Sequence, residues 1–234
     1  MLVNDFLQNS AVAFPEKIAL VCDGQRLTYE MLERQANRVA NALLDLGVQR
    51  GDRVAIWLPN SVETVVAIFA ILKVGGTFTI VNPTTKLEKL AYVLNNCTVA
   101  GLFALGKSGK QAAMLFDDVP SMRFAILCGK RADEAADPAK RIQAFPQLLE
   151  NYPATRPACP AIDVDLACLI YTSGSTGQPK GVMSTHANMV FAASSITEYL
   201  ENVPGDTVIN VLPLSFDYGL YQLLMVFKFG GTLV

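Results

Sequence analysis

The sequence has few of the side chains that most often hold metals or activate nucleophiles. It contains one histidine, His186, so a Ser-His-Asp triad or a multi-histidine metal site would have to include that residue. Its five cysteines are odd in number and include no C-x-x-C pair. This pattern argues against a disulfide framework and a zinc site, and it favours a cytoplasmic location.

Signals for export, membrane insertion and nucleic-acid binding are also missing. The first ten residues include Asp5 and have no basic flank or long apolar run, so they do not read as a signal peptide. The most apolar segment, VVAIFAILKVGG, is interrupted by Lys73 well short of a membrane span. The net charge is −2 and the basic residues are scattered, which leaves no electrostatic footprint for nucleic acid. A nucleotide remains compatible with this charge pattern.

What the sequence does contain is enough apolar residues for a large core, since 51% of its 234 residues are hydrophobic. Apolar strands alternate with amphipathic helices, which predicts an α/β fold with mostly parallel sheets flanked by helices. The proline-rich stretch NYPATRPACPAID predicts a boundary that divides the chain into residues 1–160 and 161–234. The predicted strands are residues 52–58, 77–81, 99–105, 123–128 and 206–212.

Several local signals predict where helices begin. Asn60 with Glu63 predicts one helix start, and Thr85 with Glu88 predicts a capping box for the next helix. Two further helices are expected after the proline-rich stretch, the second of which starts near Asp217. A hairpin at residues 18–29 precedes all of these elements.

The stretch YTSGSTGQPKG, residues 171–181, combines bare backbone, hydroxyl groups and one cation. Its glycines allow tight turns, and successive backbone N–H groups can form a concave nest with partial positive charge. Lys180 adds a full charge, so the loop is suited to polyphosphate. The order of residues differs from a Walker A loop, and two predicted strands flank it in place of a strand and a helix. A flexible surface loop without a ligand is the alternative interpretation.

Residues 169–188, LIYTSGSTGQPKGVMSTHAN, closely resemble the phosphate-binding signature of the adenylate-forming ligases. This superfamily includes acyl-CoA synthetases, aryl-CoA ligases, peptide-synthetase adenylation domains and luciferases. LTYEML at residues 27–32 and LKVGGTFTIVNP at residues 72–83 resemble two other motifs of the superfamily, in the same order. The resemblance therefore implies the first portion of the large N-terminal domain of an acyl-CoA synthetase-like fold.

The resemblance also implies a reaction and its participants. Such enzymes use ATP and Mg²⁺ to convert a small-molecule carboxylate into an acyl-adenylate and pyrophosphate, and they then pass the acyl group to a thiol. The thiol belongs to coenzyme A or to the phosphopantetheine of a carrier protein. His186 is the candidate catalytic residue, with a polar start for the following helix as the alternative. The positions implied to bind the nucleotide are Thr172, Ser173, Gly174, Ser175, Thr176, Gly177 and Lys180.

LPLSFDYGLYQ, residues 212–222, resembles the segment that lines the carboxylate pocket, which makes Phe216, Asp217 and Gly219 the candidate substrate residues. Coenzyme-A ligases often have histidine at the position of Phe216, whereas amino-acid-activating domains have a Phe-Asp pair. Asp217 is suited to bind a substrate ammonium, and a helix N-cap is the alternative role. Because Asn82-Pro83 and the motif that they end look closer to acyl-CoA ligases, an acyl substrate is favoured and an amino acid is the alternative.

Several features that the resemblance implies further along are missing from this sequence. They are a Tyr-Gly-x-Thr-Glu motif whose glutamate holds Mg²⁺, an aspartate for the ribose, a hinge, and a small C-terminal domain with a catalytic lysine. We therefore expect a front part of the enzyme that is inactive alone and self-associates through exposed apolar surface. A non-catalytic domain that binds phosphate or a partner is the alternative.

Overall fold

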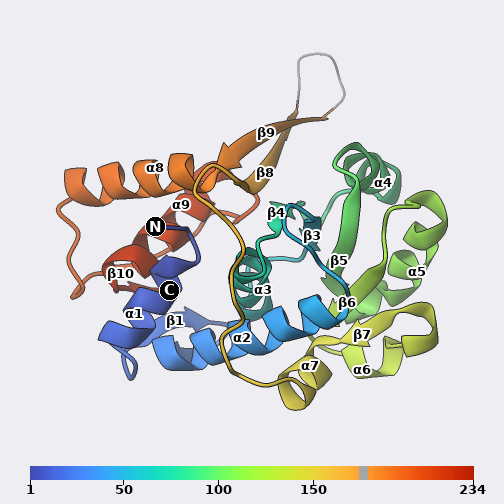
Figure 1. The fold of residues 1–234 in the computed structure, drawn as a ribbon, viewed down its shortest axis with the longest axis horizontal. Helices are drawn as coiled ribbons and strands as arrows, with labels where there is room; N and C mark the ends of the chain where they lie inside the picture. The colour runs from blue at the N-terminus through green and yellow to red at the C-terminus, as the bar shows by residue number, and fades with distance from the viewer. Residues whose placement is uncertain (174–178) are drawn as a thin grey trace.

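The structure, a computed structural model, describes residues 1–173 and 179–234, and it contains two sheets flanked by helices (Figure 1). The larger sheet has the strand order β7-β6-β5-β3-β4-β8-β9, and all of its neighbouring strands are parallel except β8 and β9. The predicted α/β fold with a mostly parallel sheet is thus confirmed. The strands are β3 (Arg53–Trp57), β4 (Thr77–Ile80), β5 (Val99–Leu105), β6 (Phe124–Cys128), β7 (Ile142–Ala144), β8 (Leu166–Ser173) and β9 (Pro179–Thr185).

The smaller sheet joins the two ends of the chain. Its order is β10-β11-β1-β2, and Leu20 of β1 lies opposite Leu233 of β11 in a parallel pair. Figure 1 accordingly shows both termini on the same side of the molecule. Both sheets contain strands from either side of residue 160, and the predicted division there stays a prediction. The bounds are β1 (Ile18–Cys22), β2 (Gln25–Thr28), β10 (Thr207–Val208) and β11 (Thr232–Leu233).

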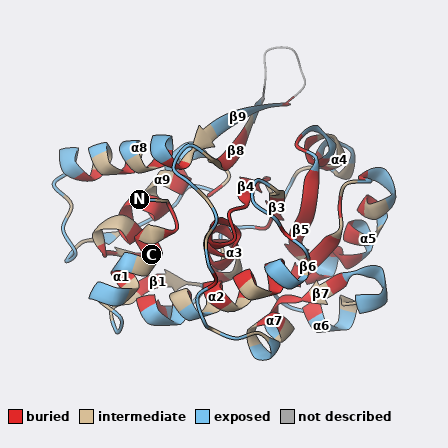
Figure 2. Cartoon of the chain, viewed as in Figure 1, coloured by how far each residue is buried: buried red, intermediate tan, exposed pale blue. Residues whose placement is uncertain are grey.

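Helices cover both faces of the larger sheet. Along β3, Val54 and Ile56 pack into the cluster that includes α2 and α3, whereas Ala55 and Trp57 pack with α4 and α5. The central strands are therefore buried on both faces, as Figure 2 shows. The helices of these two layers are α2 (Tyr29–Asp45) and α3 (Val62–Lys73) on one face, and α4 (Leu87–Asn96) and α5 (Gly109–Asp118) on the other.

The remaining helices surround this core. α1 packs against α9, and α7 packs against α2. Within the described ranges 1–173 and 179–234, no helix is both long and apolar enough to cross a membrane. The bounds are α1 (Asp5–Ala13), α6 (Ala132–Ala135), α7 (Phe145–Asn151), α8 (His186–Tyr199) and α9 (Asp217–Phe229), with short 3₁₀ turns at Gly106–Ser108 and Pro138–Lys140.

The predicted helix caps are wrong at two places. Ser61, not Asn60, is the N-cap of α3, because its extended backbone lets its hydroxyl accept a hydrogen bond from the Thr64 amide at 3.2 Å. The N-cap of α4 is Lys86, which makes no side-chain cap bond. Thr85 lies one residue earlier in a turn, where its amide donates to the Asn82 carbonyl at 2.9 Å.

The strand predicted at residues 206–212 is shorter than expected and covers only Thr207–Val208. Asn210 lies two residues beyond the strand, and its Nδ2 donates to the Gly219 carbonyl at 3.1 Å. Its Oδ1 accepts from the Leu212 amide, also at 3.1 Å. The Asn210 side chain thus links the residues after β10 to the start of α9, while the Asn210 amide still donates to the Val234 carbonyl at 2.9 Å.

Candidate functional site

One cavity of about 130 Å³ brings together the phosphate-loop strands and the predicted substrate segment. It lies at the carboxyl ends of the parallel strands β4 and β8, which is where open α/β sheets usually bind ligands. Its volume is below the roughly 300–1,000 Å³ of typical ligand pockets, so it fits part of a nucleotide or substrate. The lining residues are Ile80, Val81, Asn82, Thr85, Lys89, Val93, Tyr171, Thr172, Pro179, Ser215 and Phe216.

Thr172 and Lys180 face the same side of the β8–β9 hairpin. The two residues are directly opposite each other in the antiparallel register, so their side chains share a face with Cβ atoms about 5 Å apart. Both residues are exposed. Neither side chain has a hydrogen bond or ion pair to another described residue, which leaves a hydroxyl and an ammonium available to an anion.

The other predicted loop positions follow Thr172 in the chain. Ser173 is the last residue of β8, where its backbone pairs opposite Pro179. Gly174, Ser175, Thr176 and Gly177 lie outside the described residues. Their role in binding a nucleotide stays a prediction, whereas the expected strand on each side of the loop is confirmed.

Phe216 and Asp217 lie where the substrate segment passes into α9. Phe216 lines the cavity, remains 58% exposed and is the N-cap residue of the helix. Asp217 is the first helical residue and is exposed, so the N-cap role suggested as its alternative is wrong. A carboxylate in the first turn is favoured by the helix dipole and remains available to a ligand.

Gly219 has a packing role. It is buried in the first turn of α9, and an added Cβ would lie 2.4 Å from the Pro213 carbonyl oxygen and 2.9 Å from that of Leu212. Only glycine therefore lets α9 approach the preceding segment this closely. Direct contact between Gly219 and substrate stays a prediction.

Asn60 is a site residue that the sequence analysis misassigned. Its Nδ2 donates to the Leu212 carbonyl and its Oδ1 accepts from the Leu214 amide, each at 2.9 Å. The side chain thus holds the backbone just before Ser215 and Phe216 at the carboxyl end of β3. No pattern near Asn60 predicts this role, because its partners lie about 150 residues away in the chain.

Two residues that line the cavity itself were not predicted from the sequence. Lys89 lines the cavity from α4, and Tyr171 lines it from β8 while its hydroxyl donates to Asn96 Oδ1 at 2.6 Å. Burial raises the pKa of the Tyr171 phenol, so it remains a protonated donor at neutral pH. The only sequence signal for Lys89 is its position shortly after Asn82, which ends a predicted parallel strand.

The structure places His186 away from this cavity. His186 is fully buried at the first position of α8, and its Nδ1 accepts a hydrogen bond from the Val3 amide at 3.1 Å. The alternative, a polar start for the following helix, agrees with the position of His186 as the first residue of α8, although the capping hydrogen bonds are made by Thr185 with Asn188. The catalytic assignment of His186 stays a prediction.

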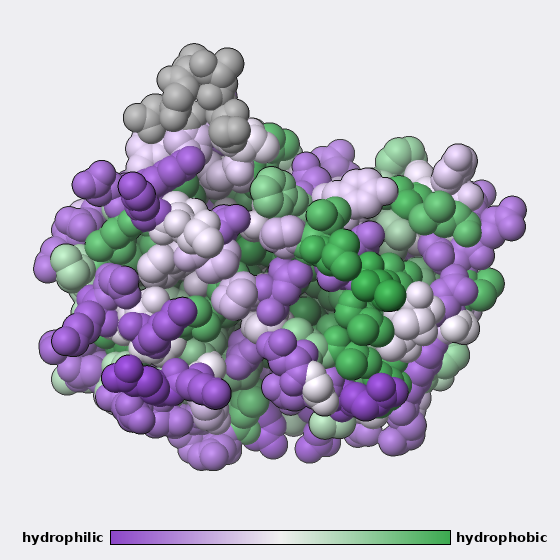
Figure 3. Space-filling model, turned by 180° about the vertical axis from the view of Figure 1, so that it is seen from behind, coloured by the Kyte–Doolittle hydropathy of each residue, from purple (hydrophilic) through white to green (hydrophobic). Residues whose placement is uncertain are grey.

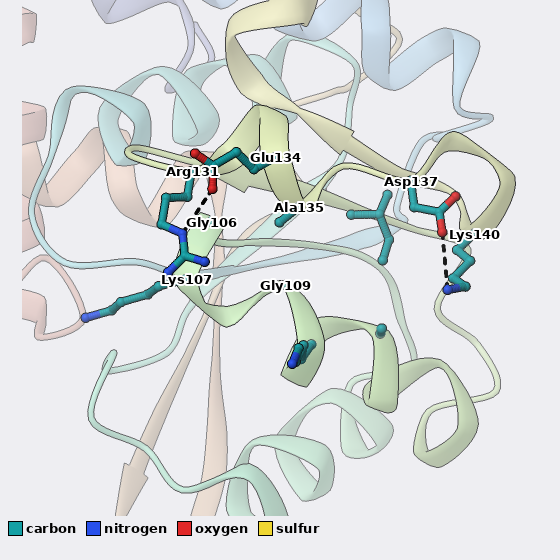
Figure 4. A pocket seen from close by; sticks show the side chains of 11 residues that line it. Gly106, Lys107, Gly109, Arg131, Glu134, Ala135, Asp137 and Lys140 are labelled. Carbon is teal, nitrogen blue, oxygen red and sulfur yellow. Dashed lines mark hydrogen bonds and ion pairs between the residues drawn. The ribbon is translucent and has the colours of Figure 1, made fainter.

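A second, open cavity of about 540 Å³ lies beyond the carboxyl ends of β5 and β6. Figure 4 shows two ion pairs on its rim, Arg131 with Glu134 and Asp137 with Lys140, both at 3.2 Å. Lys107 and Lys110 also line it and have no ion-pair partner among the described residues. The cavity therefore has an excess of positive charge.

Metal binding has no obvious centre in this part of the protein. No group of three or more His, Cys, Asp or Glu side chains within residues 1–173 and 179–234 is placed to hold a metal ion. Binding of the Mg²⁺ implied by the resemblance stays a prediction, since Mg²⁺ is often held by only one or two carboxylates together with phosphate oxygens and water.

Comparisons with known proteins agree with this geometry. The family described as AMP-binding enzyme matches residues 7–234. Phosphinothricin tripeptide synthetase PhsC from Streptomyces viridochromogenes is 32% identical over 97% of this chain, which corresponds to 19% of that protein. The structure of VinN with 3-methylaspartate is 30% identical, covers 100% of this chain and 61% of VinN, and superposes with a TM-score of 0.83.

The fold is also shared with the anthranilate CoA ligase AuaEII in complex with anthranoyl-AMP, at a TM-score of 0.91. That match covers 100% of this chain and 45% of AuaEII at 24% identity. The chain belongs to the AMP-binding enzyme family of adenylate-forming ligases. It spans 19% of the length of the first curated relatives that it matches.

Proposed function

We propose that this chain forms the ATP- and carboxylate-binding front part of an adenylate-forming ligase that activates an amino acid. The observation that carries the proposal is the cavity shared by Thr172, on the phosphate-loop hairpin, and Phe216, beside Asp217. ATP and the carboxylate must meet for adenylate formation, and this cavity lies between the two segments suited to bind them.

The reaction forms a bond between a substrate carboxylate oxygen and the α-phosphorus of ATP, and it breaks the bond to pyrophosphate. Negative charge builds on the departing pyrophosphate, and the exposed Lys180 ammonium and Thr172 hydroxyl are placed to stabilise it. Asp217 binds the substrate ammonium through a charge-assisted hydrogen bond. The pantetheine thiol of a carrier protein then attacks the acyl carbon, so that a thioester forms, the bond between the acyl group and phosphate breaks, and AMP and a proton leave.

An amino-acid substrate is favoured over the acyl substrate that the Asn82 motif suggests. Phe216 lines the cavity, and Asp217, the next residue, is exposed and does not serve as the helix N-cap. Relatives such as PhsC are peptide synthetases, and the VinN structure holds 3-methylaspartate. These likenesses support the proposal without deciding the substrate of this chain.

Replacement of Asp217 by Asn in the parent protein tests the proposal. We expect the KM for the amino acid in ATP–pyrophosphate exchange to rise about ten- to a hundredfold, because one charge-assisted bond is lost. The KM for a carboxylic acid that lacks the amino group should not change. Glu198→Gln, on the exposed face of α8, is the matched control. An unchanged KM for the amino acid would contradict an ammonium contact.

A coenzyme-A ligase is the second candidate, and one observation favours it. The cavity lined by Lys107 and Lys110 has an excess of positive charge that suits a phosphate-bearing acceptor. Comparison of free coenzyme A with a pantetheine-loaded carrier protein as acceptor decides between the two. Acyl transfer to coenzyme A that weakens in Lys107→Ala and Lys110→Ala would replace the carrier-protein proposal.

A further inference from the structure

His186 is buried, unlike most of the described residues assigned to the site. Its side chain is 0% exposed, whereas Thr172, Lys180, Phe216 and Asp217 are all exposed. It lies where β9 ends and α8 begins, and its own amide donates to the Asp165 carbonyl at 3.0 Å. Any contribution of the His186 side chain must therefore come through contacts with other buried groups of the protein.

The two ring nitrogens of His186 have different environments. Nδ1 accepts a hydrogen bond from the Val3 amide at 3.1 Å, so it carries no proton and the proton is on Nε2. Nε2 has no hydrogen-bond partner among the described residues. Nδ1 is therefore the ring atom that makes the hydrogen bond, and the imidazole is neutral.

Charged groups around the ring come from several elements. Burial is the main effect and lowers the pKa of His186, while Asp165, Asp5 and Asp163 act in the opposite direction and the N-terminal amine acts with burial. The net direction is downward, which agrees with a neutral acceptor.

The bond between Val3 and His186 joins segments that are 183 residues apart. Val3 comes just before α1, and α1 packs on α9, where Ser10 Oγ donates to the Phe227 carbonyl at 2.6 Å. The N-terminal segment thus contacts both α9 and the start of α8. His186 provides the second of these two attachments.

Lys180 lies on β9 six positions before His186, which directly follows the last residue of that strand, a separation of about 20 Å. His186 also does not line the cavity that Thr172 and Phe216 share. We propose that His186 is a positioning residue whose neutral Nδ1 ties the N-terminal segment to the end of the strand that carries Lys180. Only the link to Lys180 rests on the proposed function.

Substitutions that mimic one ring nitrogen at a time test this role in the 234-residue chain. The Oδ1 of His186→Asn lies near the position of Nδ1 and can accept from Val3, whereas the Oε1 of His186→Gln mimics Nε2. We expect His186→Asn to keep its Tm within about 2 °C of wild type, and His186→Gln and His186→Ala to lose about 3–8 °C. Hydrogen exchange at the Val3 amide should become on the order of tenfold faster in the Gln and Ala variants but not in the Asn variant.

The pH dependence gives a second readout. Because the folded pKa is lowered, the unfolded chain binds more protons below the ordinary histidine pKa of 6.5. The Tm of the wild-type chain should therefore fall as the pH drops below about 6.5. The part of this decrease that comes from protonation of His186 should be missing in His186→Asn. An identical pH profile in both proteins would contradict a titrating acceptor at this position.

Activity of the parent protein separates positioning from proton transfer. A positioning role predicts that His186→Asn retains ATP–pyrophosphate exchange within about threefold, with a larger loss in His186→Gln. If His186 were a general acid or base, the rate of ATP–pyrophosphate exchange would fall about 10²- to 10⁴-fold in both variants. Equal losses of ATP–pyrophosphate exchange in His186→Asn and His186→Gln would overturn the proposal. So would wild-type activity in His186→Gln together with a loss in His186→Asn. If the parent protein shows no ATP–pyrophosphate exchange at all, the proposed function fails. The Tm values and the hydrogen exchange of the Val3 amide still decide the role of His186.

Discussion

Strands β6 and β9 belong to the same sheet but differ sharply in their exposure. All five residues of β6 are buried, whereas β9 exposes Val182 by 52% and Met183 by 69% (Figure 2). β6 has a strand on either side and helices on both faces, but β9 is the last strand of the sheet. The apolar side chains of a strand are therefore buried only where adjacent strands and helices cover that strand.

The exposed apolar surface continues beyond β9. In the space-filling view of Figure 3, apolar surface gathers over the half of the molecule that contains α8, α9 and β10. By contrast, exposed apolar residues before residue 160 are scattered singly, as at Val12 and Met114. The exposed apolar residues between 182 and 234 are Val182, Met183, Phe191, Tyr199, Leu200, Val203, Ile209, Val211, Leu212, Phe216, Tyr218 and Val234. The self-association expected from such a surface stays a prediction.

The same substitution in the two regions provides the strongest test of this contrast. Phe124 on β6 is fully buried, and its ring occupies the space above Gly101, where an added Cβ would lie 2.1 Å from it. We expect Phe124→Ala to lower the free energy of unfolding by about 3–5 kcal/mol, measured by urea unfolding. Phe191→Ala on α8, where the ring is 74% exposed, should change it by less than about 0.5 kcal/mol. Similar decreases in the free energy of unfolding for the two variants would contradict the difference in burial between β6 and the exposed face of α8.

Lys180 tests whether the exposed region carries function without contributing to stability. In the parent protein, Lys180→Ala should slow adenylation about ten- to a hundredfold, because one contact of about 1.5–3 kcal/mol to the pyrophosphate is lost. Its free energy of unfolding should not change, since the side chain is exposed and has no ion-pair partner in the described ranges.

Two half-reactions separate the roles of Lys180. Transfer of the acyl group to the thiol should suffer less than adenylation, because pyrophosphate has already left the site. Lys180→Arg should restore activity only in part, since a planar guanidinium is bulkier than an ammonium. Equal losses in both steps would mean that Lys180 has a structural role.

The smallest expected effect concerns the edge strand. Met183→Lys on β9 should leave the free energy of unfolding within about 0.5 kcal/mol of wild type, because the side chain is already exposed. A lysine on an edge strand disfavours pairing with another strand, so sedimentation velocity should show less self-association of the 234-residue chain. Met114→Lys, at a 56% exposed position on α5, is the matched control. A monomeric wild-type chain would remove the basis for the self-association expected here.

Much of the fold could be predicted from local patterns. The hairpin of β1 and β2 turns at Asp23 and Gly24, both with positive φ, as the Asp-Gly pair indicates. The two strands around the phosphate loop are also confirmed. The helix cap predicted at Asn60 failed because an amide next to a serine offers two candidate caps, and only backbone geometry chooses between them.

The candidate site was predictable in its parts but not in its assembly. Residues such as Thr172 and Phe216 could be selected from the sequence, while neither the place of Lys89 in the cavity wall nor the bonds of Asn60 to the segment before Phe216 could be predicted. His186 was selected for its chemistry, yet its burial against Val3 depends on a segment at the other end of the chain. Neither residue type nor spacing reports such contacts.

The sequence by itself determined which segments form strands and helices, and it placed hydroxyls and a lysine around a glycine-rich loop. It could do so because periodicity, turn residues and loop composition act over a few neighbouring positions. Only the tertiary structure decided that β1 pairs with β11, that β8 lies beside β4, and that Asn60 holds the segment before Phe216. These contacts depend on how distant segments pack around a shared core, and no local pattern of residues encodes that choice.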